Sequence, residues 1–274
     1  MWTTCAILLF SVTIISWKPI GAANPDAYNS PAASSATEIF EKYVDELYQT
    51  AQLAQTGLGE DVFKKAVTGF INMKIANKIP QSSEVITVVD FNKPSSEKRM
   101  WIVDLFAKHL LINTWVAHGQ GSGGDVASSF SNIDDSHQSS LGFYVADDVY
   151  YGKHGRSLRL DGMDAGFNKN ARTREIVVHA ADYVGQNIIE LKGRLGRSQG
   201  CPAVAPEVAD QVIDAIKDKT VMFINGNASH YSSKYLDEEQ AANYVAGSSS
   251  PYIASLYRHT ALYFTLISFG MKVF

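Results

Sequence analysis

Three apolar runs follow one another closely in the chain: VITVVDF (85–91), MWIVDLF (100–106) and LLINTWVAH (110–118). Each run is rich in β-branched and aromatic residues, which favour strands. The segments between them, 92–96 and 107–108, are short and polar, as turns are. Strands joined by short turns pair antiparallel, because a parallel return needs a crossover of a dozen or more residues. The stretch therefore predicts an antiparallel meander.

Beyond the meander, the sequence predicts further strands and a single helix. Runs of strand composition lie at 141–150, 157–160, 175–179 and 220–224. A helix fits residues 206–217, where apolar residues recur at helical spacing. Those expected to face inward are Val208, Val212, Ile213 and Ile216. Because strands and helices do not alternate, the pattern predicts a β-rich α+β domain over residues 85–226.

Two helices are predicted ahead of this domain. Thr37 can cap the first, whose apolar residues recur at three- and four-residue intervals as far as Leu53. The second runs from about Glu60 to Asn77, and Pro80 stops it. Together they predict a helical hairpin over residues 37–80.

The N-terminal region has the pattern of an export signal. Cys5–Ser16 is an apolar run, shorter than the roughly 20 residues of a membrane span. Small residues follow it, which predicts a signal peptide over 1–23 with cleavage near Ala23. An uncleaved anchor is the alternative. Cleavage would leave a mature protein without an integral membrane span, located in the periplasm or outside the cell.

Two further segments have no predicted part in function. Residues 24–36 are rich in Pro, Ala, Ser and Asn, which predicts a linker. Residues 227–274 form a C-terminal extension that ends in the apolar run ALYFTLISFGMKVF (261–274). That run is too short to predict a membrane span, and a packed strand or helix is expected instead.

Composition excludes several classes of protein. The 274 residues are 46% hydrophobic and 19% charged, which is ordinary for a globular protein and not for a disordered one. The formal net charge of −4 argues against a nucleic-acid-binding protein. Two cysteines are too few for a disulfide scaffold or a Cys-rich zinc module.

Cys201 is the one cysteine that remains when residues 1–23 are removed. It lies in RSQGCP (197–202), between a Gly-rich loop and the predicted helix. A cysteine just ahead of a helix could be stabilised as thiolate by the helix dipole, and Arg194 and Arg197 would add to that effect. The thiolate is the nucleophilic form, so Cys201 is a candidate nucleophile.

A nucleophilic thiol needs a proton acceptor, and His179 is the best candidate. It ends the apolar run EIVVH (175–179), where a strand could hold it rigidly beside a cleft. His118 also ends an apolar run and is the internal competitor. A structural role is the alternative for either histidine.

Three other motifs allow both a functional and a structural interpretation. HGQGSGG (118–124) contains G-x-G-x-x-G, but no helix follows it, so a groove wall or a connecting loop is expected instead of a nucleotide site. The acidic pairs at 134–135 and 147–148 are expected to be solvated turns and not metal ligands. The basic aromatic stretch 150–159 is expected to be a surface hairpin or a contact for the carboxylates of an acidic peptide.

The chain resembles a known family in two segments above all. IVVHAADYV (176–184) and GRLGRSQGCPAV (193–204) resemble the signature of the L,D-transpeptidase (YkuD-like) catalytic domain, a His on a strand followed after a gap by Ser/Thr-x-Gly-Cys. Further stretches of the chain resemble the murein L,D-transpeptidase subgroup of that fold. They are 87–105, 116–124, 130–132, 139–144 and 150–168. The resemblance covers roughly residues 37–226.

The resemblance implies a fold and a chemistry. The fold would be a β-sandwich-like catalytic domain with the cysteine facing a groove. Cys201 would be the acylated nucleophile and His179 the general base, with Ser198 orienting the site. The backbone amides of Gly200 and Cys201 would donate to the oxyanion.

The resemblance also implies a substrate. The partners would be peptidoglycan stem peptides, joined by 3→3 crosslinking or trimmed by L,D-carboxypeptidation, and no metal, organic cofactor, nucleotide or nucleic acid is implied. The residues expected to contact substrate are His118, Ser140, Tyr151, His154 and Arg197.

The chain departs from the common pattern of the family near the cysteine. Gln199 stands where many members have His, and Pro202 and Ala203 replace an aliphatic residue and an Arg. These changes bear on the acyl acceptor, and they motivate one alternative, a non-catalytic cell-wall-binding module with the same fold. A papain-like protease is a weaker alternative, because its Cys precedes its His and here the order is reversed.

Overall fold

The computed structural model describes residues 31–247, with side chains from residue 36 onward. Eight strands and five α-helices are found in this part of the chain. The strands are β1 (Val85–Asp90), β2 (Met100–Asp104), β3 (His109–Thr114), β4 (Gly142–Gly152), β5 (Gly155–Gly162), β6 (Val177–Ala180), β7 (Ala203–Val204) and β8 (Val221–Asn225). The helices are α1 (Pro31–Thr50), α2 (Glu60–Ile75), α3 (Gln186–Lys192), α4 (Pro206–Ile216) and α5 (Glu238–Ala246).

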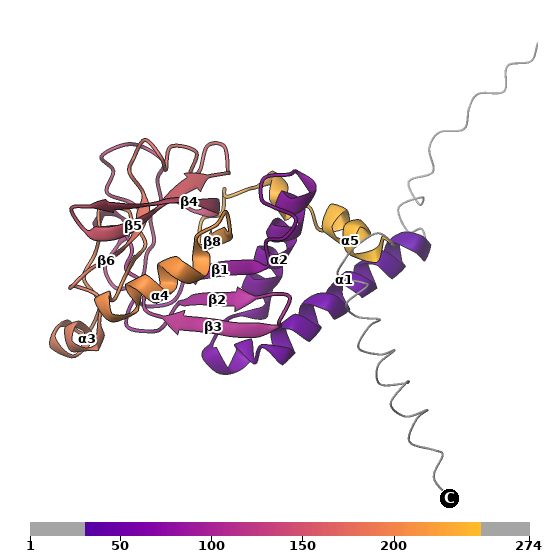
Figure 1. Cartoon of the computed structure of the whole chain (residues 1–274), viewed down its shortest axis with the longest axis horizontal. Coiled ribbons are helices and arrows are strands. Elements are labelled where there is room, and N and C mark those ends of the chain that lie inside the picture. Colours follow the sequence, from indigo (N-terminus) through magenta and orange to yellow (C-terminus); the bar gives the residue numbers. More distant parts are fainter. Residues whose placement is uncertain (1–30, 248–274) are drawn as a thin grey trace, which may run out of the picture.

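All eight strands belong to one mixed sheet in the order β3-β2-β1-β8-β4-β5-β6-β7. Figure 1 labels each of these strands except β7. The predicted meander is present, since β1 pairs antiparallel with β2 and β2 with β3. β8 lies between β1 and β4, parallel to the first and antiparallel to the second. The β-rich α+β fold expected from the sequence is therefore confirmed, and hydrogen bonding joins its strands into one continuous sheet.

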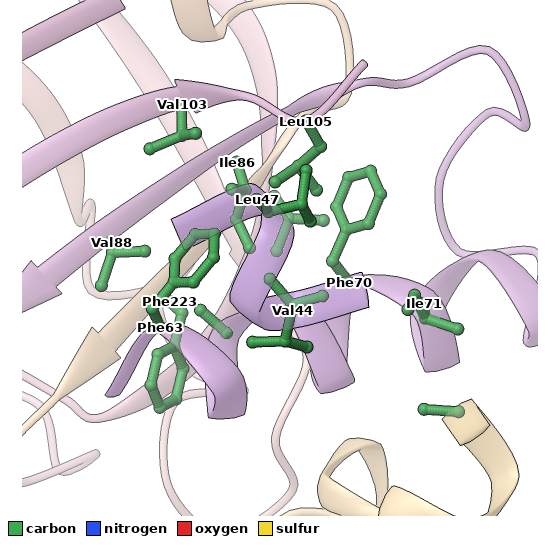
Figure 2. Close-up of a cluster of buried hydrophobic side chains, with 14 of the residues drawn as sticks. Val44, Leu47, Phe63, Phe70, Ile71, Ile86, Val88, Val103, Leu105 and Phe223 are labelled. Carbon is green, nitrogen blue, oxygen red and sulfur yellow. The ribbon is translucent and has the colours of Figure 1, made fainter. Parts of the chain in front are cut away.

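Successive residues of the central strands point to opposite faces of the sheet, and both faces are buried. Val88 and Phe223 enter a cluster shared with α1, α2 and α5, as Figure 2 shows for part of that cluster. Val89 and Met222 enter a second cluster, which contains the inward residues of α4. Because both faces are covered, these strands read as continuous apolar runs and not as alternating ones.

The N-terminal helices belong to the same core as the sheet. α2 begins at Glu60 as predicted, and its Phe63 and Phe70 are fully buried in the cluster that contains Val88. α1 begins at Pro31, so the prediction that Thr37 caps this helix is wrong: Thr37 lies inside it. Residues 31–36, expected to be part of a linker, are helical as well.

Part of the C-terminal extension packs on these helices. α5 lies beside α1 (Figure 1), and its Val245 is fully buried in the cluster shared with α1 and α2. The Asn72 side chain on α2 donates hydrogen bonds to the carbonyls of Tyr235 (2.8 Å) and Asp237 (2.7 Å).

The predicted signal peptide (1–23) and the apolar run 261–274 lie outside the described residues. Within residues 31–247, no helix combines the length and the apolar character needed to cross a membrane.

The two edges of the sheet approach each other near Cys201. The chain leaves β3 and forms an antiparallel bridge between Ala117 and Ala203 of β7. The Ala117 N–H donates to the Ala203 carbonyl at 2.8 Å. A second bridge joins Gly119 to Ser198. The loop that carries Cys201 is thereby held between β6 and the segment that follows β3.

Candidate active site

Cys201 and His179 are brought together by a short parallel pairing. β6 pairs with β7 so that His179 lies opposite Ala203. Val177 precedes His179 by two residues, and Cys201 precedes Ala203 by two residues. The Val177 N–H points at the Cys201 sulfur, 3.5 Å away. Alternate residues of a strand share a face, so Val177 and His179 point to the same side. The sulfur and the imidazole consequently line one cavity of about 760 Å³.

The cavity is open to reagents. Cys201 is partly exposed at its wall, and His179 is 98% buried, with 2% of its surface exposed. Among the other side chains that line the same cavity are His154 from the turn between β4 and β5, Arg174 from the segment before β6, and Arg197 from the loop before Cys201.

The hydrogen bonding of His179 defines its tautomer. Nδ1 lies 2.7 Å from the Ala180 carbonyl oxygen, which can only accept, so Nδ1 carries the proton and Nε2 is left with a lone pair. Burial lowers the pKa of His179, the Ala180 carbonyl opposes this, and the nearby His154 and Lys153 lower the pKa further. The ring is therefore a neutral base at neutral pH.

Cys201 is a thiol at rest. Burial raises its pKa, while the Val177 N–H and the cations Arg174 and Lys153 act in the opposite direction. The expectation that a helix dipole favours the thiolate is wrong, because α4 begins at Pro206, beyond β7. A neutral thiol beside a neutral imidazole requires proton transfer during attack and not a preformed ion pair.

Arg194 and Arg197 do not stabilise the thiolate as expected. The guanidinium of Arg194 donates to the carbonyl of Leu195 at 2.7 Å, and that of Arg197 to the carbonyl of Gly123 at 2.8 Å. Arg197 still lines the cavity, so it remains placed to contact a ligand there.

Ser198 organises the turn that presents the sulfur. Its hydroxyl donates to the Cys201 carbonyl at 2.7 Å and accepts from the Gly200 N–H at 3.0 Å. The Gly200 amide is thus occupied, which contradicts the expectation that it donates to an oxyanion. In the part of the chain that the structure describes, the Cys201 N–H has no acceptor and so could donate to a ligand.

Gly200 is required by the geometry of the turn. Its φ of +126° is a conformation that residues with a side chain rarely adopt. A Cβ at this position would lie 2.9 Å from the Gln138 carbonyl oxygen. The loop containing Gln138 can therefore pack directly against the backbone beside the sulfur.

His118 lies away from the cavity. It is fully buried, and its Nδ1 lies 2.7 Å from Nη2 of Arg99, itself fully buried. Its carbonyl accepts the Ser198 N–H at 2.9 Å, so His118 supports the cysteine loop from behind. The expected contact with substrate, and the alternative that His118 is the base, do not fit this position.

Two more of the expected substrate contacts do not line the cavity. The hydroxyl of Ser140 is buried, donates to the Ser131 carbonyl at 2.7 Å and accepts from Arg174 at 2.6 Å. Tyr151 is 80% exposed and faces away, because its neighbour Tyr150 takes the cavity side of β4. His154 lines the cavity as expected, with its ring against His179.

Arg174 is a residue of the site that sequence reasoning missed. Its guanidinium donates to the carbonyls of Ser131 (2.7 Å) and Gln138 (2.7 Å) and to the hydroxyls of Ser136 (3.1 Å) and Ser140 (2.6 Å). It thereby fixes the loop from 131 to 140 beside the sulfur. Its surroundings, NARTRE (170–175), look like an ordinary polar turn, so no local signal identifies it.

The sequence model of the L,D-transpeptidase catalytic domain matches residues 54–225. No curated protein sequence matches this chain.

Several solved structures are similar to the chain. An L,D-transpeptidase from Mycobacterium smegmatis is 12% identical, with 53% of this chain and 59% of that chain covered and a TM-score of 0.34. The helical cell shape determining protein Pgp2 from Campylobacter jejuni is 14% identical, with 65% and 60% covered and a TM-score of 0.36. An L,D-transpeptidase from Stackebrandtia nassauensis is 15% identical, with 69% and 93% covered and a TM-score of 0.32.

The chain thus spans less than two thirds of the Mycobacterium and Campylobacter structures. The family match itself covers more than half of the chain and includes β1 to β8, with both Cys201 and His179. By that match, the chain belongs to the L,D-transpeptidase catalytic domain family.

Proposed function

We propose that this protein is a cysteine acyltransferase that acts on peptidoglycan stem peptides, with Cys201 as nucleophile and His179 as general base. One observation carries the proposal: a partly exposed thiol and a neutral imidazole of defined tautomer line the same cavity. Family membership supports the choice of substrate.

The first half-reaction forms a thioester. The Cys201 sulfur attacks the carbonyl carbon of the third stem residue, a diamino acid, while its proton passes to Nε2 of His179. The negative charge that develops on the carbonyl oxygen is stabilised by the Cys201 N–H. The C–N bond to the terminal D-amino acid then breaks, and the departing amine takes the proton from His179.

The second half-reaction releases the acyl group. An acceptor amine attacks the thioester carbonyl, loses a proton to His179 and leaves a 3→3 crosslink, while the sulfur departs and regains its proton. Water in place of the amine gives a shortened stem peptide, which is the L,D-carboxypeptidase outcome.

The charges in the cavity are compatible with such a peptide. Lys153, Arg159 and Arg174 are among its basic side chains. Asp134, Asp135 and Glu175 are among its acidic ones. A stem peptide carries both carboxylates and a free amine, so a wall of mixed sign can bind it without leaving one charge unpaired.

The location follows from the substrate. We propose that residues 1–23 are a cleaved signal peptide and that the mature protein acts in the periplasm or at the cell surface, where peptidoglycan lies. Sequencing the N-terminus of the mature protein should return residues close to 24. An intact Met1 would support the anchor instead.

Covalent labelling tests the chemistry. Exposure to a carbapenem such as imipenem should add one acyl group to the protein, because a β-lactam carbonyl presents the same target to the thiol. Intact-protein mass spectrometry should detect the adduct, and Cys201→Ala should abolish both the adduct and the turnover of purified stem peptides.

For the chain that still carries residues 1–23, Cys5→Ala is the matched control, since it removes the other cysteine and should leave labelling unchanged. Labelling that persists in Cys201→Ala would contradict the proposed nucleophile. A wild-type protein that forms no adduct and turns over no stem peptide would favour the non-catalytic cell-wall-binding module.

A further inference from the structure

His154 occupies the turn of the hairpin between β4 and β5, directly over the proposed base. Its ring stacks on that of His179, with centroids 4.2 Å apart and planes inclined by 24°. His154 comes from a different hairpin than β6, so this contact is long-range and separate from the hydrogen bond that His179 makes to its own neighbour, Ala180.

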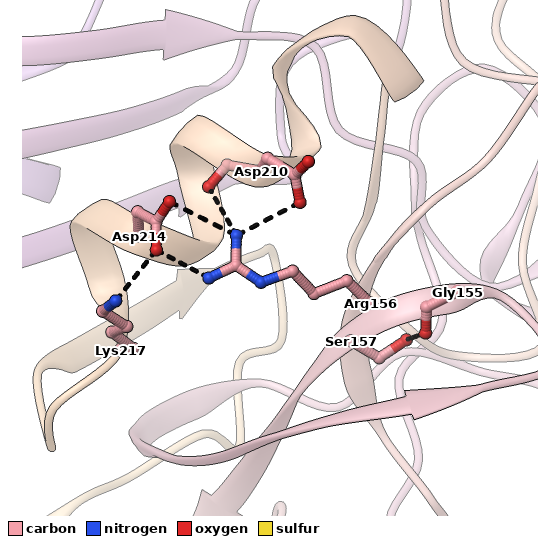
Figure 3. A network of polar contacts seen from close by, with 6 residues as sticks. All are labelled: Gly155, Arg156, Ser157, Asp210, Asp214 and Lys217. Atoms are coloured by element: carbon pink, nitrogen blue, oxygen red, sulfur yellow. Dashed lines mark hydrogen bonds and ion pairs between the residues drawn. The ribbon is translucent and has the colours of Figure 1, made fainter.

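The hairpin is anchored on both sides of the stack. β5 pairs with β6 in a register that sets Ser157 opposite His179. Arg156, two residues after His154, reaches across to α4 and donates to the carboxylates of Asp210 (3.1 Å) and Asp214 (2.6 Å), as Figure 3 shows. Lys217 contacts Asp214 from the end of the same helix at 2.9 Å.

Charge pairs of this exposed kind are individually weak, but a guanidinium that contacts two carboxylates is geometrically specific. Together with the β5–β6 register, it fixes where the turn lies relative to β6. The ring of His154 is therefore presented to His179 by a positioned segment.

The hydrogen bond to Ala180 and the stack on His154 constrain the ring of His179 in different ways. A hydrogen bond at Nδ1 fixes one atom of the ring but leaves the ring free to tilt about that bond. Packing on its face removes the tilt and sets the direction of the Nε2 lone pair. A general base depends on that direction, because proton transfer requires Nε2 to point at the thiol.

We propose that His154 is a positioning residue for His179, acting through its flat ring and not through its charge. The inference rests on the proposed function only in taking His179 as the base for Cys201. It replaces the expectation that His154 serves chiefly to bind a carboxylate of the substrate.

Titratable groups on several segments line the cavity around His179, among them Arg159, Arg174 and Glu175. His154 and Lys153 face His179 from the hairpin, Cys201 from the loop before β7, and Tyr183 from the segment after β6. A positive charge on His154 opposes protonation of His179, so a ring that cannot ionise should serve positioning at least as well.

Alkylation of Cys201 by iodoacetamide gives the test, because this neutral reagent carries no carboxylate for a side chain to bind. The rate is measured from about pH 5 to pH 9 on the full chain, and mass spectrometry of the peptide containing Cys201 separates it from Cys5. The variants are His154→Ala, which removes the ring, and His154→Phe, which keeps a flat ring without a charge.

We expect His154→Ala to slow alkylation at pH 7 by about ten-fold, because Nε2 of His179 would no longer be held in the direction that accepts the proton of the Cys201 thiol. His154→Phe should stay within about two-fold of wild type and shift the acid limb of the pH profile upward, since the cation that lowers the pKa of His179 is gone. His230→Ala is the matched control, because His230 is also exposed and stacked on an aromatic ring, that of Phe167.

Two outcomes overturn the inference. An unchanged rate in His154→Ala would show that the stack does not position the base. A loss in His154→Phe as large as that in His154→Ala would assign the effect to charge or hydrogen bonding. Carbapenem labelling of the same proteins is read separately: if wild type is not acylated while the alkylation rates follow expectation, the proposed function fails and the role of His154 stands.

Discussion

At the level of single residues, Arg99 and His118 form a buried pair that nothing in the sequence indicates. Arg99 is fully buried and donates to the carbonyl of Val116 (3.0 Å), to that of Lys93 (2.7 Å) and to Nδ1 of His118. A guanidinium has no acceptor, so His118 must accept at Nδ1 and remain neutral. Burial, followed by repulsion from Arg99, lowers the pKa of His118 to about 4.

This pair predicts a loss of stability in mild acid. The folded-state pKa of His118 lies below the ordinary value of 6.5, so between pH 6.5 and pH 4 the unfolded chain binds the extra proton. Stability should therefore fall as pH is lowered through this window, with His118 contributing roughly 3 kcal/mol.

Urea unfolding at pH 7 and at pH 4 measures the effect. His118→Asn keeps an acceptor for Arg99 without a titrating ring, so it should lose less stability on acidification than wild type. His109→Asn is the control, because His109 is exposed on β3. Identical acid sensitivity in wild type and His118→Asn would refute the assignment.

The sequence could predict two residues that meet at one cavity, but not the residues that support them. Cys201 and His179 sit in a recognisable local pattern, and the structure places both at one cavity. Arg174 and His154 act through contacts with segments far away in the chain. Such contacts depend on the register of β4, β5 and β6, which a single sequence does not specify.

Among the elements, α2 lies close against the sheet at Gly69. A Cβ there would lie 2.0 Å from the ring of Phe143 on β4. That ring cannot move freely, because it stacks on Phe223 at 4.5 Å and meets Tyr235 edge-on at 6.1 Å. Gly69 therefore sets the distance between the helix and the sheet.

Gly69→Ala should destabilise the protein by about 1–3 kcal/mol, the cost of overpacking a core. A loss of stability would be informative, because alanine inside a helix is otherwise favoured over glycine by about 1 kcal/mol. Chemical denaturation of Gly69→Ala, Phe143→Leu and the double variant gives a thermodynamic cycle. The alanine should cost clearly less in the Phe143→Leu background, and an equal cost in both would contradict the contact.

The elements were predictable where the local pattern is strong. The strands of the meander are apolar runs between short polar turns, and the apolar residues of α2 and α4 recur every three to four positions, so all of these lie close to their expected bounds. β7 has two residues and α3 has no fully buried side chain, so neither produces such a pattern. The expected inward position of Val208 is only partly realised, as it remains half-exposed.

At the scale of the whole molecule, the described part of the C-terminal extension is tied to the body of the domain. Asn72 is 1% exposed and satisfies two carbonyls of that segment, those of Tyr235 and Asp237. Asp164 holds the same segment through Tyr231 (2.8 Å) and Ser233 (2.5 Å).

Asn72→Leu should therefore lower the free energy of unfolding by about 2–4 kcal/mol, since both carbonyls lose their donor in a buried setting. Thermal or urea unfolding measures this. Asn187→Leu, at an exposed position of α3, is the control and should change stability little. A wild-type-like Asn72→Leu would mean that the segment is not held by these bonds.

The order of the strands could not be predicted from the sequence. Local patterns identify where strands are, and neighbouring ones such as β1, β2 and β3 pair with each other as expected. The placement of β8 between β1 and β4 depends on non-local packing against both faces, to which no short motif corresponds.

That central position of β8 has a consequence for how the chain acquires its structure. Ile86 pairs with Val221, so the middle of the sheet unites segments more than a hundred residues apart. Until β8 has been synthesised, the edge of β1 that pairs with it has no strand partner, although the antiparallel pairs of β1, β2 and β3 can already form. Closure over such a span is entropically slow, and an open edge invites pairing with other chains. Synthesis of this protein should therefore pass through a window in which assistance from a chaperone matters most.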